Sequence, residues 1–216
     1  MKNKKFIYAG ICALGAFILW TILVRIIDVS AIGPEGSSVG FAALNGAFHQ
    51  LTGVHMWLYD LTDLLSVVPL GFVGGFALLG LIQWIKRKQL SKVDRSIFIL
   101  GGYFIVVLAV FFLFEKLVIN YRPVLIEGVL EASYPSSTTM LVMCVMPVTM
   151  IQFYSRLVTR SLRLGITVIL SLFSAFMVIG RLLCGVHWLT DIIGGALLSM
   201  GLVMLYSGIN GLCKKA

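Results

Sequence analysis

The stretch IFILGGYFIVVLAVFFLF, residues 97–114, contains no charged side chain and no polar stripe. A helix packed against a soluble core shows polar residues along one side, because that side meets water. A hydrocarbon layer about 30 Å thick is instead crossed by a helix of roughly 20 apolar residues. The stretch therefore predicts a helix that spans a membrane.

The composition of the whole chain agrees with this prediction. Of 216 residues, 59% are hydrophobic and 12% are charged, whereas about 25% of an average soluble domain is charged. Lipid is therefore expected to surround most of the surface. Six apolar runs are long enough to span a bilayer: residues 6–27, 58–85, 97–119, 137–154, 164–183 and 189–209. The predicted fold class is all-α, an integral membrane bundle of six transmembrane helices that forms a single domain over residues 1–216.

Neither a cleaved leader nor a metal or disulfide framework is expected. The opening MKNKK precedes an apolar run that exceeds the ~7 to 15 residues of a signal-peptide core, so the first helix is expected to remain uncleaved. The four cysteines stand singly, without the paired spacing typical of a zinc site or a disulfide framework. Acidic residues are too scarce for a Mg²⁺ cage. No cofactor and no metal ion are expected.

The basic residues indicate how the chain crosses the membrane. Most of them fall in segments that a six-helix plan places on one side: Lys2, Lys4, Lys5, Lys86, Arg87, Lys88, Lys92, Arg95, Arg156, Arg160, Arg163, Lys214 and Lys215. Cytoplasmic loops carry an excess of Lys and Arg, so that side, with both termini, is expected to be cytoplasmic in a plasma membrane. The net charge of +8 is thus mainly a topology signal that also attracts anionic headgroups. A nucleic-acid partner is not expected, because the short basic loops lack interleaved aromatic residues.

A smaller group of cations marks the opposite, external side. Lys116, Arg122 and Arg181 each lie at that end of a predicted helix. Three polar segments reach the same face: EKLVINYRP at 115–123, YPSSTT at 134–139 and GRLLCGVHWLTD at 180–191. Ionisable groups in membrane segments are usually functional. Their convergence therefore predicts a site on the external face.

The third polar segment contains a candidate nucleophile. His187 and Asp191 are four residues apart, so their side chains share one face if a helix begins near His187. The carboxylate then accepts a hydrogen bond from one imidazole nitrogen, and the other nitrogen keeps a lone pair of fixed direction. An imidazole held in this way acts as a nucleophile or a general base. The alternative interpretation of His187 is an interfacial group beside Trp188 in an aromatic belt.

The remaining polar side chains fit a phosphate group. Arg122 and Arg181 carry planar guanidinium forks that match phosphate oxygens. Ser136 and Ser137 add hydroxyls at the start of a predicted helix, where free N–H groups attract anions. The alternatives are that the two serines only start the helix and that Arg122 is an isolated external charge. Together with His187, these residues predict an anion site beside a nucleophile.

These motifs resemble the type-2 phosphatidic acid phosphatase superfamily, membrane lipid phosphate phosphatases related to glucose-6-phosphatase and vanadium haloperoxidases. The resemblance covers residues 116–191 by motif and the whole chain by its six-helix plan. It is carried by Arg122-Pro123, by Pro135-Ser136 and by Arg-x5-His-x3-Asp from Arg181 to Asp191. It implies that His187 attacks phosphorus to form a phosphohistidine and that Asp191 orients the imidazole. It also implies that the phosphoryl oxygens are held by Arg122, Arg181 and Ser136.

Three positions depart from the pattern of the superfamily. Gly180 stands where the pattern has a serine. Lys116 is one residue closer to the Arg-Pro pair than the lysine of the pattern, and Glu115 holds the lysine's place. Thr138 replaces the histidine that, in the superfamily, protonates the leaving alkoxide. Such general acid help is worth about 10²- to 10⁴-fold, and a threonine hydroxyl is too weak an acid to supply it.

The missing acid bears on the substrate. A phosphate leaves from a diphosphate more easily than an alkoxide leaves from a monoester, so a prenyl diphosphate such as undecaprenyl diphosphate is favoured over phosphatidic acid. His49 and His55, on the external side before the second apolar run, are possible replacements for the acid. An interfacial or packing role is the favoured interpretation of both histidines.

Two function classes remain open. The favoured one is a metal-independent lipid phosphatase or diphosphatase that acts at the outer leaflet on a lipid substrate. The alternative is a non-catalytic protein that keeps the phosphate pocket in order to bind or transport a lipid phosphate. The candidate catalytic residues are His187 and Asp191, and the candidate substrate-binding residues are Arg122, Arg181, Ser136, Ser137, Thr138 and Lys116.

Overall fold

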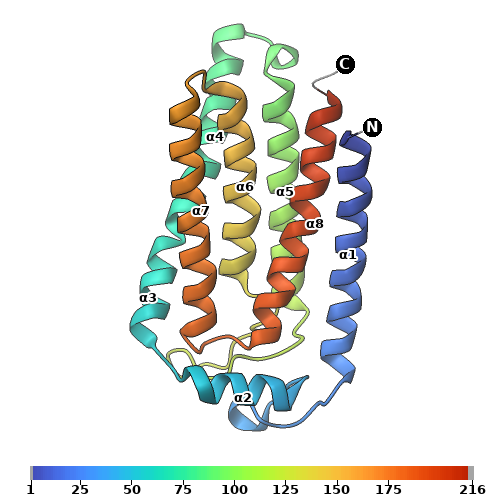
Figure 1. Ribbon diagram of the computed structural model, residues 1–216, viewed down its shortest axis with the longest axis vertical. Helices are drawn as coiled ribbons and strands as arrows, with labels where there is room; N and C mark the ends of the chain where they lie inside the picture. The colour runs from blue at the N-terminus through green and yellow to red at the C-terminus, as the bar shows by residue number, and fades with distance from the viewer. Residues whose placement is uncertain (1, 214–216) are drawn as a thin grey trace.

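The computed structural model describes residues 2–213, and its regular structure is helical (Figure 1). The α-helices in this range are α1 (Lys2–Ile26), α2 (Ala42–Thr52), α3 (Met56–Leu65), α4 (Val67–Arg87), α5 (Arg95–Lys116), α6 (Ser137–Arg156), α7 (Arg160–Leu183) and α8 (Leu189–Cys213). Two short 3₁₀ helices, η1 (Pro34–Gly36) and η2 (Leu90–Lys92), lie in connections. The predicted all-α class is confirmed. Lys214 and Lys215, whose charges entered the predicted orientation, lie outside the described residues.

Six helical segments are long and apolar enough to cross a membrane: Asn3–Ile26, Met56–Arg87, Arg95–Lys116, Ser137–Arg156, Arg160–Leu183 and Leu189–Cys213. They coincide with the six predicted runs to within a few residues. Large apolar side chains on their outer faces are exposed, for example Ile105 at 69% and Leu172 at 66%. Hydrocarbon accommodates such side chains where water does not, so the surface fits the membrane bundle that the sequence predicts.

The second span differs from its prediction because it consists of two helices, α3 and α4, that meet at Ser66. Pro69 explains the break. Proline lacks an N–H group, and its ring clashes with the carbonyl four residues earlier, which belongs to Leu65, the last residue of α3. Beyond the break α3 packs against α7, and this contact brings α3 side chains to the site described below.

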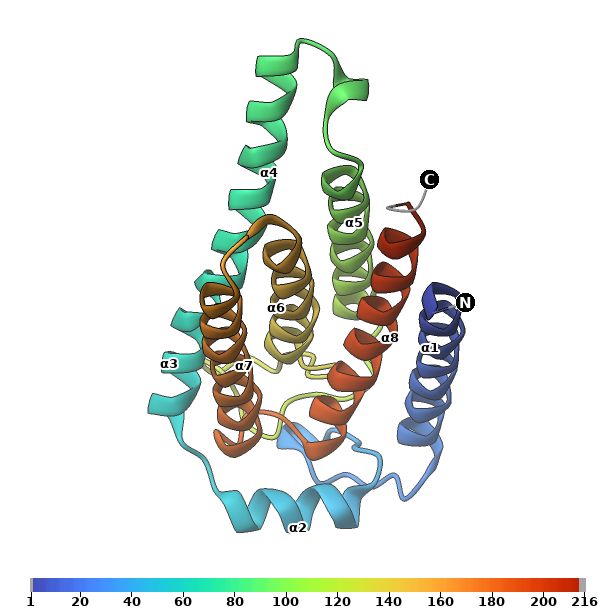
Figure 2. The ribbon, with the colours of Figure 1, turned by 45° about the horizontal axis from the view of Figure 1, so that its top comes forward.

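Helices α6 and α8 form the centre of the bundle, and α1 packs along α8 (Figure 1). Small residues permit the close contact of α1 with α8, because a Cβ on Gly201 would lie 2.7 Å from the side chain of Leu14, and one on Gly208 would lie 2.5 Å from that of Ile7. Glycines of this kind let membrane helices approach closely. The end of α4 and the connection that contains η2 extend beyond the other helices at one end (Figure 2).

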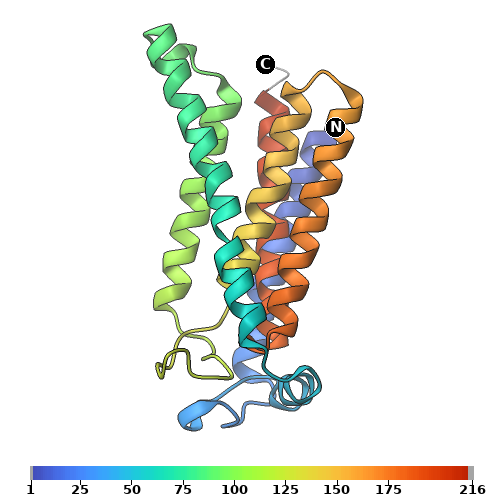
Figure 3. The same ribbon diagram turned by 90° about the vertical axis from the view of Figure 1, so that its left-hand side faces the viewer.

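The two ends of the bundle carry different kinds of residue. One end of the bundle contains the start of α1, the end of α8 and the α4–α5 and α6–α7 connections (Figure 3). Within residues 2–213, the basic residues of the predicted cytoplasmic side belong to these segments. The three polar motif segments lie at the opposite end (Figure 1). The structure therefore brings together the segments that the sequence placed on one face.

The motif end is covered by α2, which lies across the end of the bundle (Figures 1 and 2). Asn45 fastens α2 to the start of α8, because its Nδ2 donates to Thr190 Oγ1 at 3.0 Å and its Oδ1 accepts from the Thr190 N–H at 3.2 Å. Gly185 has φ +73°, and a Cβ there would lie 2.0 Å from the Gly53 oxygen. Only glycine allows this approach of the α2–α3 turn to the α7–α8 connection.

Candidate active site

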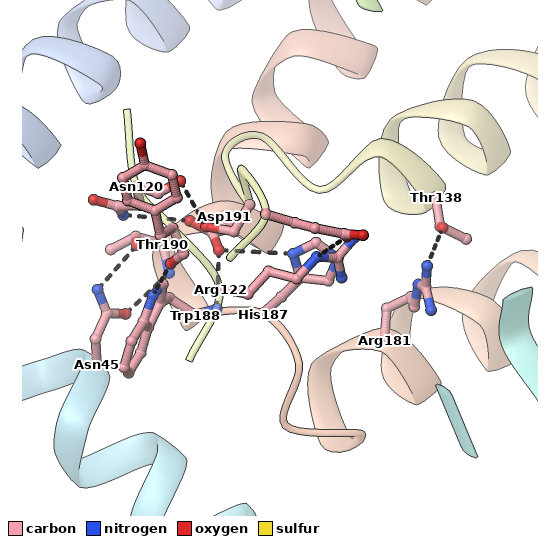
Figure 4. Close-up of polar contacts among 12 residues, drawn as sticks. Asn45, Asn120, Arg122, Thr138, Arg181, His187, Trp188, Thr190 and Asp191 are labelled. Atoms are coloured by element: carbon pink, nitrogen blue, oxygen red, sulfur yellow. Dashed lines mark hydrogen bonds and ion pairs between the residues drawn. The ribbon is translucent and has the colours of Figure 1, made fainter. Parts of the chain in front are cut away.

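His187 lies in the connection just before α8, and Asp191 is the third residue of that helix. The Asp191 carboxylate is fully buried and accepts hydrogen bonds from the Trp188 N–H at 2.9 Å and from Asn120 Nδ2 at 3.4 Å. Asp191 is the third helical residue, and its carboxylate accepts from the backbone N–H of Trp188, the residue before the helix. This contact is one half of a capping box. The same contacts that start α8 therefore fix Asp191 beside the imidazole (Figure 4).

The two nitrogens of the His187 ring face different partners. Nδ1 lies 3.7 Å from Asp191 Oδ2, and Nε2 lies 3.4 Å from Arg122 Nη1 (Figure 4). Because the guanidinium only donates hydrogen bonds, Nε2 is the acceptor and the ring proton belongs on Nδ1, toward Asp191. The lone pair on Nε2 consequently points at the group that is expected to bind phosphate.

Burial keeps this ring neutral. The pKa of His187 is lowered from 6.5 to about 4, chiefly by burial and also by the positive charge of Arg122, while the nearby Asp191 carboxylate acts in the opposite direction. The unfolded chain takes up a proton below pH 6.5, whereas the native ring does so only near pH 4. Stability is therefore lost as the pH falls through this window.

We expect the His187 ring to be neutral at pH 5.5, which nitrogen-15 chemical shifts of labelled histidine can measure in detergent. Arg122→Met removes a nearby positive charge and is expected to raise this pKa. Protonation of the native ring near pH 6.5 would contradict the buried, neutral imidazole.

Arg122 comes from the long connection between α5 and α6 and is 7% exposed. Its side-chain Nε lies 3.0 Å from Glu131 Oε2, and its backbone N–H donates to the Glu131 carbonyl at 3.0 Å. Its guanidinium carbon lies 5.8 Å from the ring centroid of Tyr59 on α3. The side chain is thus held between a carboxylate and an aromatic face.

Arg181, near the end of α7, is 2% exposed and is held mainly by α3. Its Nη2 donates to Thr138 Oγ1 at 2.6 Å and lies 3.3 Å from Asp63 Oδ1 (Figure 4 shows the Thr138 contact). Its Nη1 lies 3.4 Å from both the Tyr59 carbonyl and Thr62 Oγ1, and its guanidinium carbon lies 4.7 Å from the Tyr59 ring centroid. Tyr59 therefore contacts both arginines.

The start of α6 completes the cluster. The Ser136 N–H donates to the Asp191 carbonyl at 3.1 Å, which joins the second motif to the third. Buried polar atoms here without an aligned hydrogen bond among the described residues include Ser136 Oγ, Arg181 Nε and Arg122 Nε, the last of which lies 3.0 Å from Glu131 Oε2. Buried polar groups normally have partners. All three can donate, so this end of the bundle retains capacity for an anionic acceptor.

A pocket of about 350 Å³ lies beside part of this cluster, although Arg181 and Ser136 do not line it. Its lining includes Arg122, Glu131, Ser137 and His187. An apolar groove of about 470 Å³ between α4, α5 and α6 shares Ser137 with the pocket and has Asp63 and Thr138 in its wall. A polar chamber thus adjoins a hydrocarbon-lined one.

A family model matches part of the chain. Residues 119–211 match the PAP2 superfamily. The match contains Arg122, the start of α6 and the segment from Arg181 to Asp191, so the resemblance expected from the motifs is confirmed. Helix α3, with Tyr59 and Asp63, lies outside the matched PAP2 range.

A solved PAP2 structure shares the fold. It is the "Crystal structure of the first transmembrane PAP2 type phosphatidylglycerolphosphate phosphatase from Bacillus subtilis". The two chains superpose with a TM-score of 0.60 over 96% of this chain and 97% of that chain, at 18% sequence identity. At this identity the likeness shows the fold. No curated protein sequence matches the chain.

Several predicted candidates stand apart from the pocket. Lys116 is exposed at the end of α5, and Glu115 lines the pocket instead. The His49 ring packs against Trp188, with 5.5 Å between centroids, and exposed His55 contacts the Thr52 carbonyl at 2.9 Å. Neither histidine lines the pocket. Among residues 2–213, no group of three His, Cys, Asp or Glu side chains is placed to hold a metal ion.

The structure also explains one departure from the PAP2 pattern and adds residues that the motifs did not indicate. A Cβ at Gly180 would lie 2.8 Å from Thr62 Cγ2, so α3 occupies the space of the serine side chain. The added residues are Asn120, which contacts Asp191, and the arginine partners Tyr59, Asp63 and Glu131. Asn120 was detectable as an amide close to the Arg-Pro pair. The α3 residues carry no such local signal.

Proposed function

We propose that the protein is an integral membrane phosphatase that hydrolyses a lipid phosphate or a prenyl diphosphate, such as undecaprenyl diphosphate, through a phosphohistidine on His187. The PAP2 match supports a lipid phosphatase. The observation that carries the mechanism is the orientation of His187, whose Nδ1 faces a buried carboxylate while its Nε2 faces Arg122 beside the pocket. A protein that only binds lipid phosphate has no need of this arrangement.

The proposed reaction has two displacements. In the first, the Nε2 lone pair of His187 forms a bond to phosphorus, and the bond from phosphorus to the leaving oxygen breaks. The Asp191 carboxylate stabilises the positive ring that forms, as in other carboxylate–histidine pairs. Arg122, Arg181 and the α6 start balance the charge on the phosphoryl oxygens. In the second displacement, water attacks phosphorus and releases phosphate and neutral His187.

The leaving group decides between substrates. Thr138 Oγ1 accepts a hydrogen bond from Arg181 at 2.6 Å, and a hydroxyl is too weak an acid to protonate an alkoxide efficiently. We therefore expect the purified protein to release phosphate from undecaprenyl diphosphate about 10²-fold faster than from phosphatidic acid, the lower end of the value of general acid help. Phosphatidylglycerol phosphate belongs in the same assay, because the Bacillus subtilis protein is named as a phosphatase for it.

Thr138→His is the diagnostic variant for this assay. An imidazole at this position is expected to raise phosphatidic acid turnover more than diphosphate turnover, because only the alkoxide needs the acid. Thr139→His is the matched control, since Thr139 is the buried neighbour without a contact to Arg181 among the described residues. Comparable turnover of both lipids by the native protein would contradict the proposed preference for a diphosphate.

The proposed location is the outer leaflet of a bacterial plasma membrane. The motif segments lie at one end of the bundle, and the connections that contain most of the basic residues lie at the other (Figure 3). Cytoplasmic loops are enriched in Lys and Arg, which supports an external active site with cytoplasmic termini. Residues 1–216 are proposed to form a single domain.

A further inference from the structure

Each of the two buried arginines of the site is paired with a carboxylate. Arg122 Nε lies 3.0 Å from Glu131 Oε2, and Arg181 Nη2 lies 3.3 Å from Asp63 Oδ1. The two arginine side chains are 9% and 2% exposed. A buried charge without a partner is costly, so these carboxylates balance the two cations when no other anion does.

The two carboxylates are exposed enough to move away from the arginines. The side chains of Glu131 and Asp63 are 42% and 59% exposed, in contrast to the arginines that they pair with. Glu131 lines the polar pocket, and Asp63 lines the adjoining groove. Arg122 Nε has no aligned hydrogen bond despite its closeness to Glu131, so this pair is an ion pair without a fixed hydrogen bond. Water can therefore solvate either carboxylate once it moves away.

Tyr59 contacts both guanidinium groups through its ring face, which does not compete with an anion for their N–H donors. Its ring centroid lies 5.8 Å from the guanidinium carbon of Arg122 and 4.7 Å from that of Arg181. The face of an aromatic ring attracts a cation without bringing a negative charge into the site. The two guanidinium groups can thus keep their positions while their counter-ions exchange.

We propose that Asp63 and Glu131 are exchangeable counter-ions that a bound phosphate group displaces and that return to expel the phosphate product. This inference rests on the proposed function, because it assigns a phosphate ligand to the same arginines. The two carboxylates carry two negative charges, as does a phosphate dianion, so the exchange leaves the charge of the buried arginines balanced. Asp63 and Glu131 accordingly weaken the hold on free phosphate and promote product release.

The test is the binding of inorganic phosphate to the full chain in detergent at pH 8, measured by isothermal titration calorimetry. Asp63→Asn and Glu131→Gln each remove a competing charge and keep the side-chain shape. Each is expected to lower the dissociation constant about fivefold, from the usual range of partly exposed ion pairs. Their combination is expected to lower it by about 5- to 25-fold, because the two pairs involve different arginines but share Tyr59 and one phosphate ligand, which reduces additivity.

The matched control is Asp60→Asn with Glu127→Gln, which makes the same changes on α3 and in the α5–α6 connection at exposed residues without an ion pair in the described structure. Asp63→Glu keeps the charge and is expected to bind phosphate as weakly as the native protein. A merely structural role would not produce tighter binding, because structural damage weakens a site. In turnover assays the inhibition constant of phosphate is expected to fall in parallel.

The outcomes separate this inference from the proposed function. Tighter binding by the double variant and unchanged binding by the control support the exchange. Equal or weaker binding by the double variant would overturn the exchange and leave the phosphatase intact. If neither the native protein nor any variant binds phosphate, the phosphate pocket itself is wrong and the exchange is wrong with it.

Discussion

His187→Ala is expected to reduce phosphate release from the preferred lipid by at least about 10⁴-fold, the scale on which removal of a nucleophile acts. The ring is 3% exposed, and its Nε2 is the nitrogen beside Arg122 and the pocket. Alanine removes the only atom of the third motif that is placed to form the covalent bond. Phosphate release by purified protein in detergent measures the loss.

His55→Ala is the matched control for that loss. His55 is exposed, its ring contacts the Thr52 carbonyl, and it does not line the pocket. Its replacement is expected to leave turnover within about twofold of the native rate, as for surface substitutions away from special features. Retention of most activity by His187→Ala would exclude His187 as the nucleophile.

Asp191→Asn is expected to reduce turnover by about 10³- to 10⁴-fold, as for the equivalent change in a carboxylate–histidine pair. The amide oxygen can still accept from the Trp188 N–H, which preserves the start of α8. It brings no negative charge, however, to stabilise the ring after attack. The amide nitrogen then stands in place of Oδ1, where it cannot accept a hydrogen bond from Asn120 Nδ2. The expected loss is therefore in kcat more than in KM.

Asp28→Asn makes the same chemical change at another helix start. Asp28 Oδ2 accepts from the Ala43 N–H at 2.7 Å at the start of α2, where it is exposed. This variant is expected to keep nearly full turnover, with at most a small loss of stability. If Asp191→Asn is as active as Asp28→Asn, the proposed role of Asp191 in catalysis is wrong.

The sequence predicts the bundle well because each span is a long apolar run without competing signals. The break between α3 and α4 was not predicted, although Pro69, four residues after Leu65, is a local signal for it. Helix α2 was missed because it is too short to span a bilayer and because Asn45 fastens it to Thr190, a contact distant in sequence.

In the site, too, residues within short motifs could be predicted, whereas contacts between residues distant in sequence could not. The spacing of His187 and Asp191 on one helix start, and their closeness to Arg122 and Ser136, follow from motifs within short segments. The contacts of Tyr59 and Asp63 with Arg181 join residues of α3 and α7 that only the folded bundle brings together. A motif can indicate which groups act, but the partners that balance their charge are set by packing.

The most direct test of the central claim is to trap phosphate on the protein. The native protein is mixed with undecaprenyl diphosphate labelled in its terminal phosphate, quenched in alkali, which preserves a phosphorus–nitrogen bond, and mapped by mass spectrometry. The account predicts label on His187, none in His187→Ala, and label that disappears when the native protein is chased with unlabelled lipid. Turnover by the native protein without label on His187, or with label on another residue, would contradict it.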